Sequence, residues 1–378
     1  MRGCDVPECT VMLFFLMVIQ VQAAWERNYD MFRTDYPKGA FCTAIAGACA
    51  SDHNPENAFF QNPAALAFGN EEHELYYDAD FNPHDEIEPG MQTSDQVGGL
   101  IAMAGLGYFW KRFGLGVSYV LRQSTVTSPS SALVDDQGGL HSLKAQSAGY
   151  TSLITVPMGV RIHENWSVGL SFVGLYYQET LAITTPDGQK LASPVSSGFP
   201  SMGLTVGTIY QPLQSLRLGA WMRLPIALAI NQGFSYTYAG NSINYSEQLT
   251  MWQPYLSGVG ASMLLSRHQT LFVDLYFIGT TQYGFLRTLD FFDDTVLGRE
   301  LLEKGHLMVI EPHLAYKIEI GRGAVSFGGY YESARVGGEK NHIHAAFGVS
   351  YHFSFAEIQG AFDVAEDFRS FQVSMRKF

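Results

Sequence analysis

The segment Ile343-His-Ala-Ala-Phe-Gly-Val-Ser-Tyr-His-Phe353 carries an apolar residue at every second position over its whole length. Successive side chains of a β-strand point to opposite faces, so this pattern predicts a strand with one apolar face. The other face holds His, Gly and Ser, and it has none of the Asp, Glu, Lys or Arg that normally cover the wet face of a soluble sheet. The segment therefore predicts a β-sheet whose apolar face is not packed into a soluble core.

The same alternation recurs on both sides of this segment, for example in 113–119, 166–172 and 216–224. Many of the predicted strands have ten residues or more, and tilted strands of about 9–11 residues are the length that crosses a bilayer. We predict fourteen strands, at 73–82, 98–110, 113–124, 144–161, 166–180, 200–211, 216–230, 247–264, 270–283, 306–320, 324–335, 342–353, 355–364 and 367–378.

The connections between these strands tend to alternate between long and short. The long ones are 83–97, 125–143, 181–199, 231–246 and 284–305. The short ones are 111–112, 163–165, 211–215, 266–269 and 321–323. Outer-membrane barrels have short periplasmic turns and long outside loops, so this parity predicts a bacterial outer-membrane barrel with both chain ends in the periplasm.

Composition agrees with that class of protein. Charged residues make up only 16% of the 378 residues, and there are 38 glycines. No apolar run after the N-terminus is long enough for a membrane helix, which excludes a helical membrane protein. The formal charge of −13 argues against nucleic-acid binding. The acidic stretch 71–88 is interpreted as a solvated loop, and a cation site there stays open although the spacing of a calcium loop is missing.

The N-terminus predicts export. Val11–Val21 is an apolar core, and it ends in Val21-Gln22-Ala23, which has the small-x-small form of a cleavage site, so 1–23 is assigned as a signal peptide. Cys42 and Cys49 would remain in the mature chain. In an exported protein they form either a disulfide or two free thiols, and the sequence leaves both open.

One further stretch, Asp52-His-Asn-Pro-Glu-Asn-Ala-Phe-Phe-Gln-Asn-Pro-Ala-Ala-Leu66, lies between the leader and the first strand. It follows the small-residue segment 44–51. An acidic residue (Asp52 or Glu56), then Phe59-Phe60, then Asn62-Pro63-Ala64 form a pattern that resembles the FadL/TodX/OmpP1 family of outer-membrane transporters for long-chain fatty acids and other hydrophobic compounds. The match at this level covers about twenty residues, and the rest of the chain matches in architecture only.

The resemblance implies an all-β protein, a transmembrane antiparallel barrel of about 14 strands in 71–378, with its lumen plugged by an N-terminal hatch in 24–70. Asn62, Pro63 and Ala64 would join hatch to barrel, and we assign them with Phe59 and Phe60 to the hatch and its gating. Pro63 fixes its own φ and pushes Asn62 toward extended geometry. The alternative for Asn62-Pro63 is an ordinary turn.

The family releases its substrate sideways through a break in the barrel wall, located in the third strand. Gly114 and Gly116 of the segment 113–124 are the candidates here, and glycines in strands alternatively mark bulges or close packing. Prolines inside predicted strands are other possible kinks: Pro157, Pro225, Pro254 and Pro312.

Alternation places Arg217, Trp221 and Arg223 on one inward face, a cationic partner for a carboxylate beside an apolar ring. A lattice of salt bridges with Glu311, Glu319 and Glu332 is the competing interpretation. His342 and His344 share a face, but no third ligand is identifiable, so we interpret them as polar lining and expect no metal site. No catalytic motif is present, so neither a cofactor nor an enzymatic activity is expected.

The sequence therefore predicts uptake of long-chain fatty acids or other hydrophobic small molecules, driven by diffusion across the outer membrane, with outer-membrane lipid around the barrel. Protein partners are not indicated. A scaffold that does not transport, serving a secretion system, is the alternative function. An outer-membrane hydrolase is a weaker one, because Asp135-Asp136 is the sole hint and adjacent strand residues point to opposite faces.

Overall fold

The computed structural model describes residues 39–69, 73–82, 98–127, 131–134, 140–184, 190–197, 201–238, 241–253, 255–279, 282–291, 294–300, 309–333, 341–366 and 369–377. The predicted signal peptide, the first part of the predicted hatch and the terminal Phe378 lie outside these residues. Among the described helices, none combines the length and the apolar character that a membrane crossing requires.

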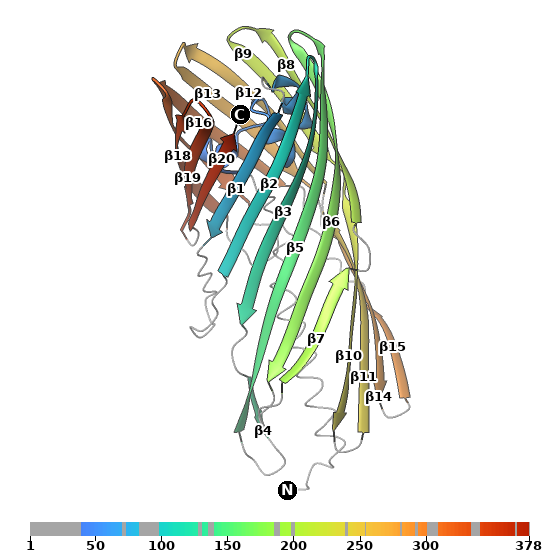
Figure 1. Ribbon diagram of the computed structural model, residues 1–378. Coiled ribbons are helices and arrows are strands. Elements are labelled where there is room, and N and C mark those ends of the chain that lie inside the picture. Colours follow the sequence, from blue (N-terminus) through green and yellow to red (C-terminus); the bar gives the residue numbers. More distant parts are fainter. Residues whose placement is uncertain are drawn as a thin grey trace.

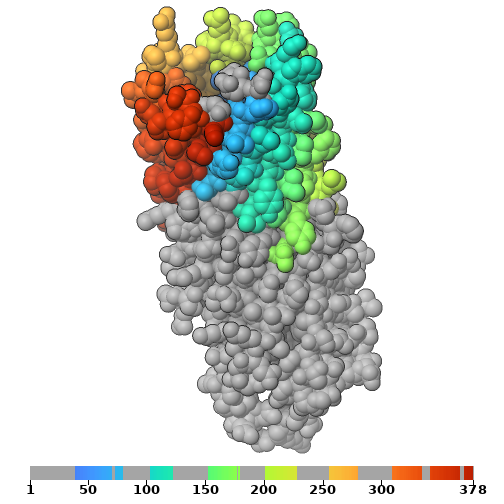
Figure 2. Space-filling model, in the orientation of Figure 1, coloured from blue at the N-terminus to red at the C-terminus, as the bar shows by residue number. Residues whose placement is uncertain are grey.

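Fourteen antiparallel strands form a closed barrel, as predicted (Figure 1). Closure comes from the first strand, which pairs with β2 on one side and with the last strand on the other, as in the pair Tyr77 and Met375. In Figure 2 these two strands lie side by side, blue against red. In order around the ring, the strands are β1 (His73–Asn82), β2 (Gly98–Trp110), β3 (Phe113–Thr127), β5 (Leu140–His163), β6 (Trp166–Thr184), β8 (Ser201–Leu213), β9 (Leu216–Arg223), β12 (Leu256–Ser266), β13 (Gln269–Ile278), β16 (Val309–Ile320), β17 (Gly323–Glu332), β18 (His342–His352), β19 (Ala356–Val364) and β20 (Arg369–Lys377).

Six further strands extend the sheet at the end opposite the short turns (Figure 1). They are β4 (Ser131–Val134), β7 (Lys190–Ser197), β10 (Ile226–Tyr238), β11 (Asn241–Gln253), β14 (Gln282–Phe291) and β15 (Asp294–Glu300). The prediction that 231–246 and 284–305 are loops was therefore wrong over most of their length. Phe234-Ser-Tyr236-Thr-Tyr238 alternates, and its aromatic residues favour strands, so pairing continues there.

The two faces of the barrel wall differ as the alternation predicts. In β18 the side chain of Ile343 is 78% exposed, whereas that of His344 is 3% exposed. Phe347 and Val349 also point outward, and Ala346 and Gly348 point inward. The apolar face of this strand is thus the outer surface of the barrel, which is the surface that lipid would cover.

Three short helices lie inside the barrel at the end that carries the short turns (Figure 1). These are α3 (Gly39–Ala44), α4 (Asn57–Phe60) and the 3-10 helix η1 (Pro63–Phe68). We call residues 39–69 the inner segment. Nearly all of it is buried, and it contacts inward side chains of strands on every side of the ring.

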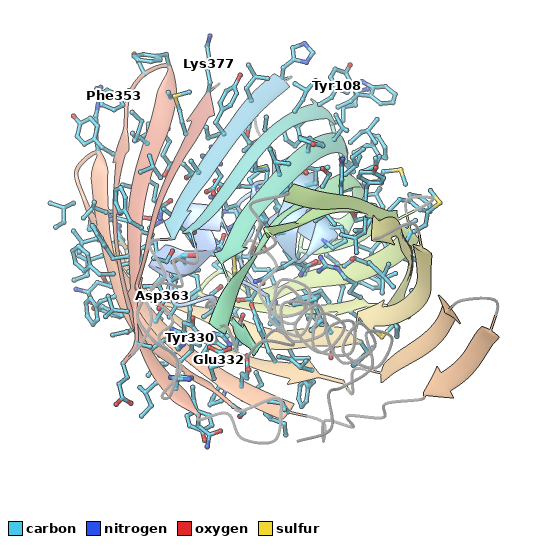
Figure 3. All side chains as sticks on the ribbon, turned by 90° about the horizontal axis from the view of Figure 1, so that it is seen from below. Tyr108, Tyr330, Glu332, Phe353, Asp363 and Lys377 are labelled. Carbon is cyan, nitrogen blue, oxygen red and sulfur yellow. A yellow bond between two sulfur atoms is a disulfide. The ribbon has the colours of Figure 1, made fainter. Side chains whose placement is uncertain are left out.

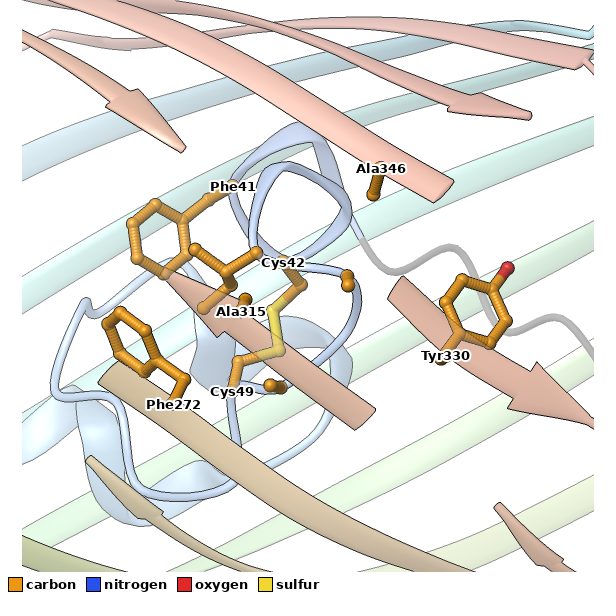
Figure 4. Close-up of a cluster of buried hydrophobic side chains, with 10 residues drawn as sticks. Phe41, Cys42, Cys49, Phe272, Ala315, Tyr330 and Ala346 are labelled. Atoms are coloured by element: carbon orange, nitrogen blue, oxygen red, sulfur yellow. A yellow bond between two sulfur atoms is a disulfide. The ribbon is translucent and has the colours of Figure 1, made fainter. Parts of the chain in front are cut away.

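A disulfide joins Cys42 to Cys49, with 5.7 Å between their Cα atoms, which decides between the two alternatives that the sequence left open. It lies in a cluster of buried side chains that includes Phe41 of the inner segment, Phe272 of β13 and Ala315 of β16 (Figure 4). The disulfide closes the loop that packs against this part of the wall, so it restricts the backbone of the inner segment where it meets β13 and β16.

Candidate functional site

Asn62 holds the Asn-Pro-Ala turn together. Its backbone is extended (φ −101°, ψ 99°), as predicted for a residue before proline, and Pro63 begins η1. The Oδ1 atom of Asn62 accepts a hydrogen bond from the Ala64 amide at 3.1 Å, which caps the helix. Its Nδ2 atom donates to the carbonyl oxygens of Ala50 at 2.7 Å and of Thr208 in β8 at 3.2 Å. One side chain therefore connects two parts of the inner segment to the barrel wall.

The wall opposite this turn is a row of glycines on four neighbouring strands. Gly114 of β3 pairs directly with Gly159 of β5, Gly159 with Gly169 of β6, and Gly169 with Gly207 of β8. We call these four residues the glycine row. Because none of them has a side chain, the row leaves a smooth path along which the backbone of residues 62–67 can lie.

The approach along the glycine row is very close. A Cβ atom added to Gly169 would lie 2.3 Å from the backbone nitrogen of Ala64. One added to Gly207 would lie 2.1 Å from Oδ1 of Asn62, and one at Gly114 would lie 2.3 Å from the carbonyl oxygen of Leu66. Any larger residue at these positions has to push the turn away from the wall.

Two arginines of the barrel wall donate hydrogen bonds to backbone carbonyl oxygens on either side of the same turn. Arg223 of β9 donates from Nη2 to the carbonyl oxygen of Phe60 at 2.8 Å and from Nε to Oγ1 of Thr205 at 3.0 Å. Arg161 of β5 donates to the carbonyl oxygen of Ala67 at 2.9 Å. Hydrogen bonds from a charged donor are stronger than neutral ones, so these contacts fix both ends of the turn.

Arg217, Trp221 and Arg223 do share an inward face, as the alternation predicts. Arg217 donates to Nδ1 of His53 at 2.7 Å, and Trp221 packs edge-on against Tyr276 with ring centroids 5.7 Å apart. These contacts all go to the inner segment or to the wall around it. A role of the three residues in binding a carboxylate stays a prediction.

The other side of the wall presents a row of polar and aromatic side chains. Asp274, His313, Tyr330 and His344 occupy directly paired positions on β13, β16, β17 and β18, and we call them the polar row. Oδ2 of Asp274 accepts from the Ala50 amide at 2.7 Å, and Nδ1 of His313 lies 2.6 Å from the carbonyl oxygen of Ala46. The polar row therefore binds the backbone around the disulfide loop.

The rings of the polar row stack on one another. His313 and Tyr330 have centroids 4.9 Å apart, and Tyr330 and His344 have centroids 4.2 Å apart. His344 lies between two carboxylates, with Nδ1 3.0 Å from Asp363 and Nε2 2.9 Å from Glu332. The predicted polar lining is thus a connected network, and Glu332, which the sequence offered as an arginine partner, bonds to a histidine.

The pairing of β3 with β5 is interrupted next to the inner segment. In these two fully described strands the ladder runs from the pair Leu115 and Met158 directly to the pair Ser118 and Thr155. The positions left unpaired are Gly116 and Val117 on β3, opposite Pro157 and Val156 in the same register. Arg161 donates its amide to Arg112. In an antiparallel pair, every second residue of a strand directs its amide at the same neighbour, so the amide of residue 157 would point at β3. Residue 157 is a proline, which has no amide hydrogen to donate.

Phe59 lies on the inner side of this interruption. A Cβ atom at Gly116 would be 2.8 Å from Cε1 of Phe59, so the ring rests directly on the glycine. The same ring packs against Tyr76 of β1 with centroids 5.0 Å apart. Phe60 is equally buried and contacts the α3 end of the inner segment, near Gly39. Of the two predicted phenylalanines, Phe59 is therefore the one that faces the interruption.

Glu56 is a buried carboxyl group within the inner segment, and its Oε1 atom has no hydrogen-bond partner among the described residues. Burial raises the pKa of Glu56 well above its ordinary value, and the nearby carboxylate of Asp78 raises this pKa further, while Arg376 opposes the shift. At neutral pH this buried carboxyl group therefore destabilises the folded state, whereas a neutral side chain at the same position would not.

Several residues of this site are not apparent from the sequence. Arg161, Asp274 and Tyr276 have no motif around them, and the glycine row depends on the register between strands that are far apart in the chain. A usable signal does exist, because each glycine of the row occupies an inward position in its own alternating pattern.

Neither a family model nor a curated protein sequence matches this chain. Solved structures do match. The toluene transporter TbuX of Ralstonia pickettii matches with a TM-score of 0.66 at 15% identity, covering 90% of this chain and 97% of that one. The toluene transporter TodX of Pseudomonas putida matches with a TM-score of 0.64 at 12% identity, with coverages of 90% and 97%. A FadL homologue of Pseudomonas aeruginosa matches with a TM-score of 0.59 at 13% identity, with coverages of 90% and 97%.

The barrel and its inner segment thus define a β-barrel of the outer-membrane class. Within that class the chain has the FadL-type fold, which confirms the resemblance seen at Asp52–Leu66 at the level of architecture.

Substitution in the glycine row should displace the Asn-Pro-Ala turn. We expect Gly169→Ala to destabilise the packed inner segment by about 1–3 kcal/mol, because the new Cβ overlaps the backbone of Ala64. Gly174→Ala is the matched control on β6, since its Cβ would meet only the carbonyl oxygen of Ile154, at 3.9 Å. Hydrogen exchange of residues 62–67 measures the effect. Equal protection of this stretch in both variants would contradict the prediction.

The order of the inner segment around Glu56 should depend on pH. Since the folded state raises the pKa of Glu56, stability is lost as pH rises from the ordinary glutamate range toward that raised value. Over this window local opening should increase by up to about tenfold per pH unit. Glu56→Gln should remove the dependence, and the exposed Glu164→Gln should keep it. Protease sensitivity of residues 52–61 across pH tests this, and an unchanged profile in Glu56→Gln would rule the idea out.

Proposed function

We propose that this protein is an outer-membrane transporter that takes up hydrophobic small molecules, with long-chain fatty acids as the first candidate substrates. The observation that carries the proposal is the inner segment itself, which fills the short-turn end of a FadL-type barrel and contacts strands all around it. Fourteen strands enclose a lumen that would otherwise conduct water, so a plug of this kind suits selective uptake.

In this proposal residues 24–70 act as the hatch and 71–378 as the barrel. Substrate enters from the long-loop end and meets the inner segment, which blocks a straight path to the periplasm. Transfer of an apolar molecule into water is unfavourable, so exit from the lumen directly into the membrane is the route of lower free energy. The interruption between β3 and β5 is the opening that we propose, with Phe59 as the side chain that covers it from within.

The proteins with similar structures support a hydrophobic substrate without selecting one. TbuX and TodX are toluene transporters, and CymD is a monoaromatic hydrocarbon channel. Uptake of this kind needs no energy source beyond the concentration gradient. We keep Arg217, Trp221 and Arg223 as the proposed site for a fatty acid head group. The bonds of Arg223 to Phe60 and Thr205 mean that the inner segment has to shift before a carboxylate can reach it.

The bound ligand is the direct test of this function. Protein purified from its own membrane should retain fatty acids or other apolar compounds that mass spectrometry identifies after extraction. Arg217→Gln together with Arg223→Gln should reduce fatty acid retention, because the cationic partner of the carboxylate is lost. The control is Arg287→Gln together with Arg299→Gln, which removes two cations from β14 and β15. A barrel that retains no apolar ligand and instead purifies with a stable protein partner would favour the scaffold function.

Restoring the ladder should close the proposed exit. Pro157→Val supplies the missing amide opposite Gly116, and each restored backbone hydrogen bond contributes about 1 kcal/mol, so uptake should fall by roughly fivefold. Pro312→Val is the matched control, because it supplies an amide in β16, far from the interruption. Uptake of a labelled fatty acid by cells that carry each variant measures the effect. Unimpaired uptake by Pro157→Val, with normal surface assembly, would argue against this exit.

A further inference from the structure

The short-turn end of the barrel carries an exposed set of cations. Lys111 and Arg112 form the turn between β2 and β3, Arg267 lies between β12 and β13, and Arg322 lies between β16 and β17. Lys377 ends β20 at the same end of the barrel, near the C mark in Figure 1. All five side chains are exposed, and we call them the basic rim.

This charge is opposite in sign to that of the rest of the chain. The five short connections contain four Lys or Arg residues and a single Asp or Glu residue, namely Glu164. The five long connections contain four Lys or Arg residues and twelve Asp or Glu residues, and the whole chain has a formal charge of −13. The basic rim is therefore a local feature, and composition does not account for it.

The side chains of the rim cations make few contacts with the described residues. Within the part of the chain that the structure describes, no carboxylate forms an ion pair with any of the five. The nearby Glu319 lies 3.6 Å from Lys317, which offsets its charge. The ammonium group of Lys111 lies 5.6 Å from the ring centroid of Trp110, a contact that leaves its hydrogen-bond donors available.

The exposed apolar residues beside the rim indicate how deep its cations lie relative to the bilayer. Trp110 is 62% exposed and directly precedes Lys111, and Ile320 is 65% exposed and lies two residues before Arg322. Tyr108, near the end of β2, and Phe353, directly after β18, lie on the outside of the barrel wall (Figure 3). A strand rises about 3.3 Å per residue, so the cations lie within about 7 Å of surface that belongs in the apolar or interfacial zone. That is the depth of lipid phosphate groups.

We propose that the basic rim binds the phosphate groups of anionic phospholipids in the leaflet that faces the short turns. Arginine matches phosphate oxygens with two parallel N–H donors, and lysine supplies a point charge. Each cation near an anionic membrane surface contributes a favourable attraction of its own, so the rim selects anionic over zwitterionic lipid around this end of the barrel. The inference rests on the barrel alone and is independent of what the lumen transports.

The test uses the full-length protein in bilayers of phosphatidylcholine that contain spin-labelled phosphatidylglycerol or spin-labelled phosphatidylcholine. We expect the wild type to associate preferentially with the anionic label, and added salt to weaken that preference. The variant Lys111→Gln, Arg112→Gln, Arg267→Gln and Arg322→Gln should lose it, with a change of up to about fivefold per cation removed.

A matched control removes the same number of cations from β5, β7, β14 and β15 at the end of the sheet opposite the short turns: Lys144→Gln, Lys190→Gln, Arg287→Gln and Arg299→Gln. The control should keep the preference, and the heat-dependent gel mobility of folded barrels verifies assembly of each variant. A wild type without preference for the anionic label, or a rim variant that keeps it, would overturn the proposal. Loss of lipid preference in both variants would assign the effect to net charge. Salt-sensitive binding of an acidic protein by a rim without lipid preference would assign the rim to a protein partner instead.

Discussion

The close contact between the backbone of residues 62–67 and the glycine row is the constraint on which the rest of the site depends. Because no side chain separates the turn from the wall, the carbonyl oxygens of Phe60 and Ala67 come within reach of Arg223 and Arg161. The same short separation brings the side-chain amide of Asn62 within hydrogen-bonding distance of the carbonyl oxygen of Thr208. A wall with larger residues would hold the turn too far away for any of these bonds.

The two halves of the wall hold the inner segment by different physical means. The glycine row offers shape and van der Waals contact, and its partners are backbone atoms of the turn. The polar row offers directed hydrogen bonds from Asp274 and His313 to the backbone near the disulfide. Buried polar groups are costly unless they are paired, so the polar half tolerates little displacement. The interruption between β3 and β5 lies on the half with the glycine row, where steric contact along the row is combined with hydrogen bonds from Arg161 and Arg223.

Much of the barrel could be predicted from the sequence, because period-two alternation is local and is seen in strands of the ring such as β13, β16 and β18. The inward face of Arg217, Trp221 and Arg223 followed from the same rule. Their partners did not, since Phe60 and His53 lie more than 150 positions away along the chain. The glycine row could not be predicted for the same reason, because the register between neighbouring strands depends on the tertiary structure. The prediction that 231–246 and 284–305 are loops was wrong, because the alternation inside these ranges indicates strands and the length of the connection does not.

The inner segment also bonds to both strands that meet at the seam of the barrel. The amide of Ala40 donates to Asp78 of β1 at 2.6 Å, and the hydroxyl of Thr43 donates to Gln372 of β20 at 2.8 Å. Since β1 and β20 also pair with each other, the inner segment bridges the seam from within the lumen. Displacing the end of the inner segment that contains Ala40 and Thr43 would therefore remove contacts from both strands of the seam at once.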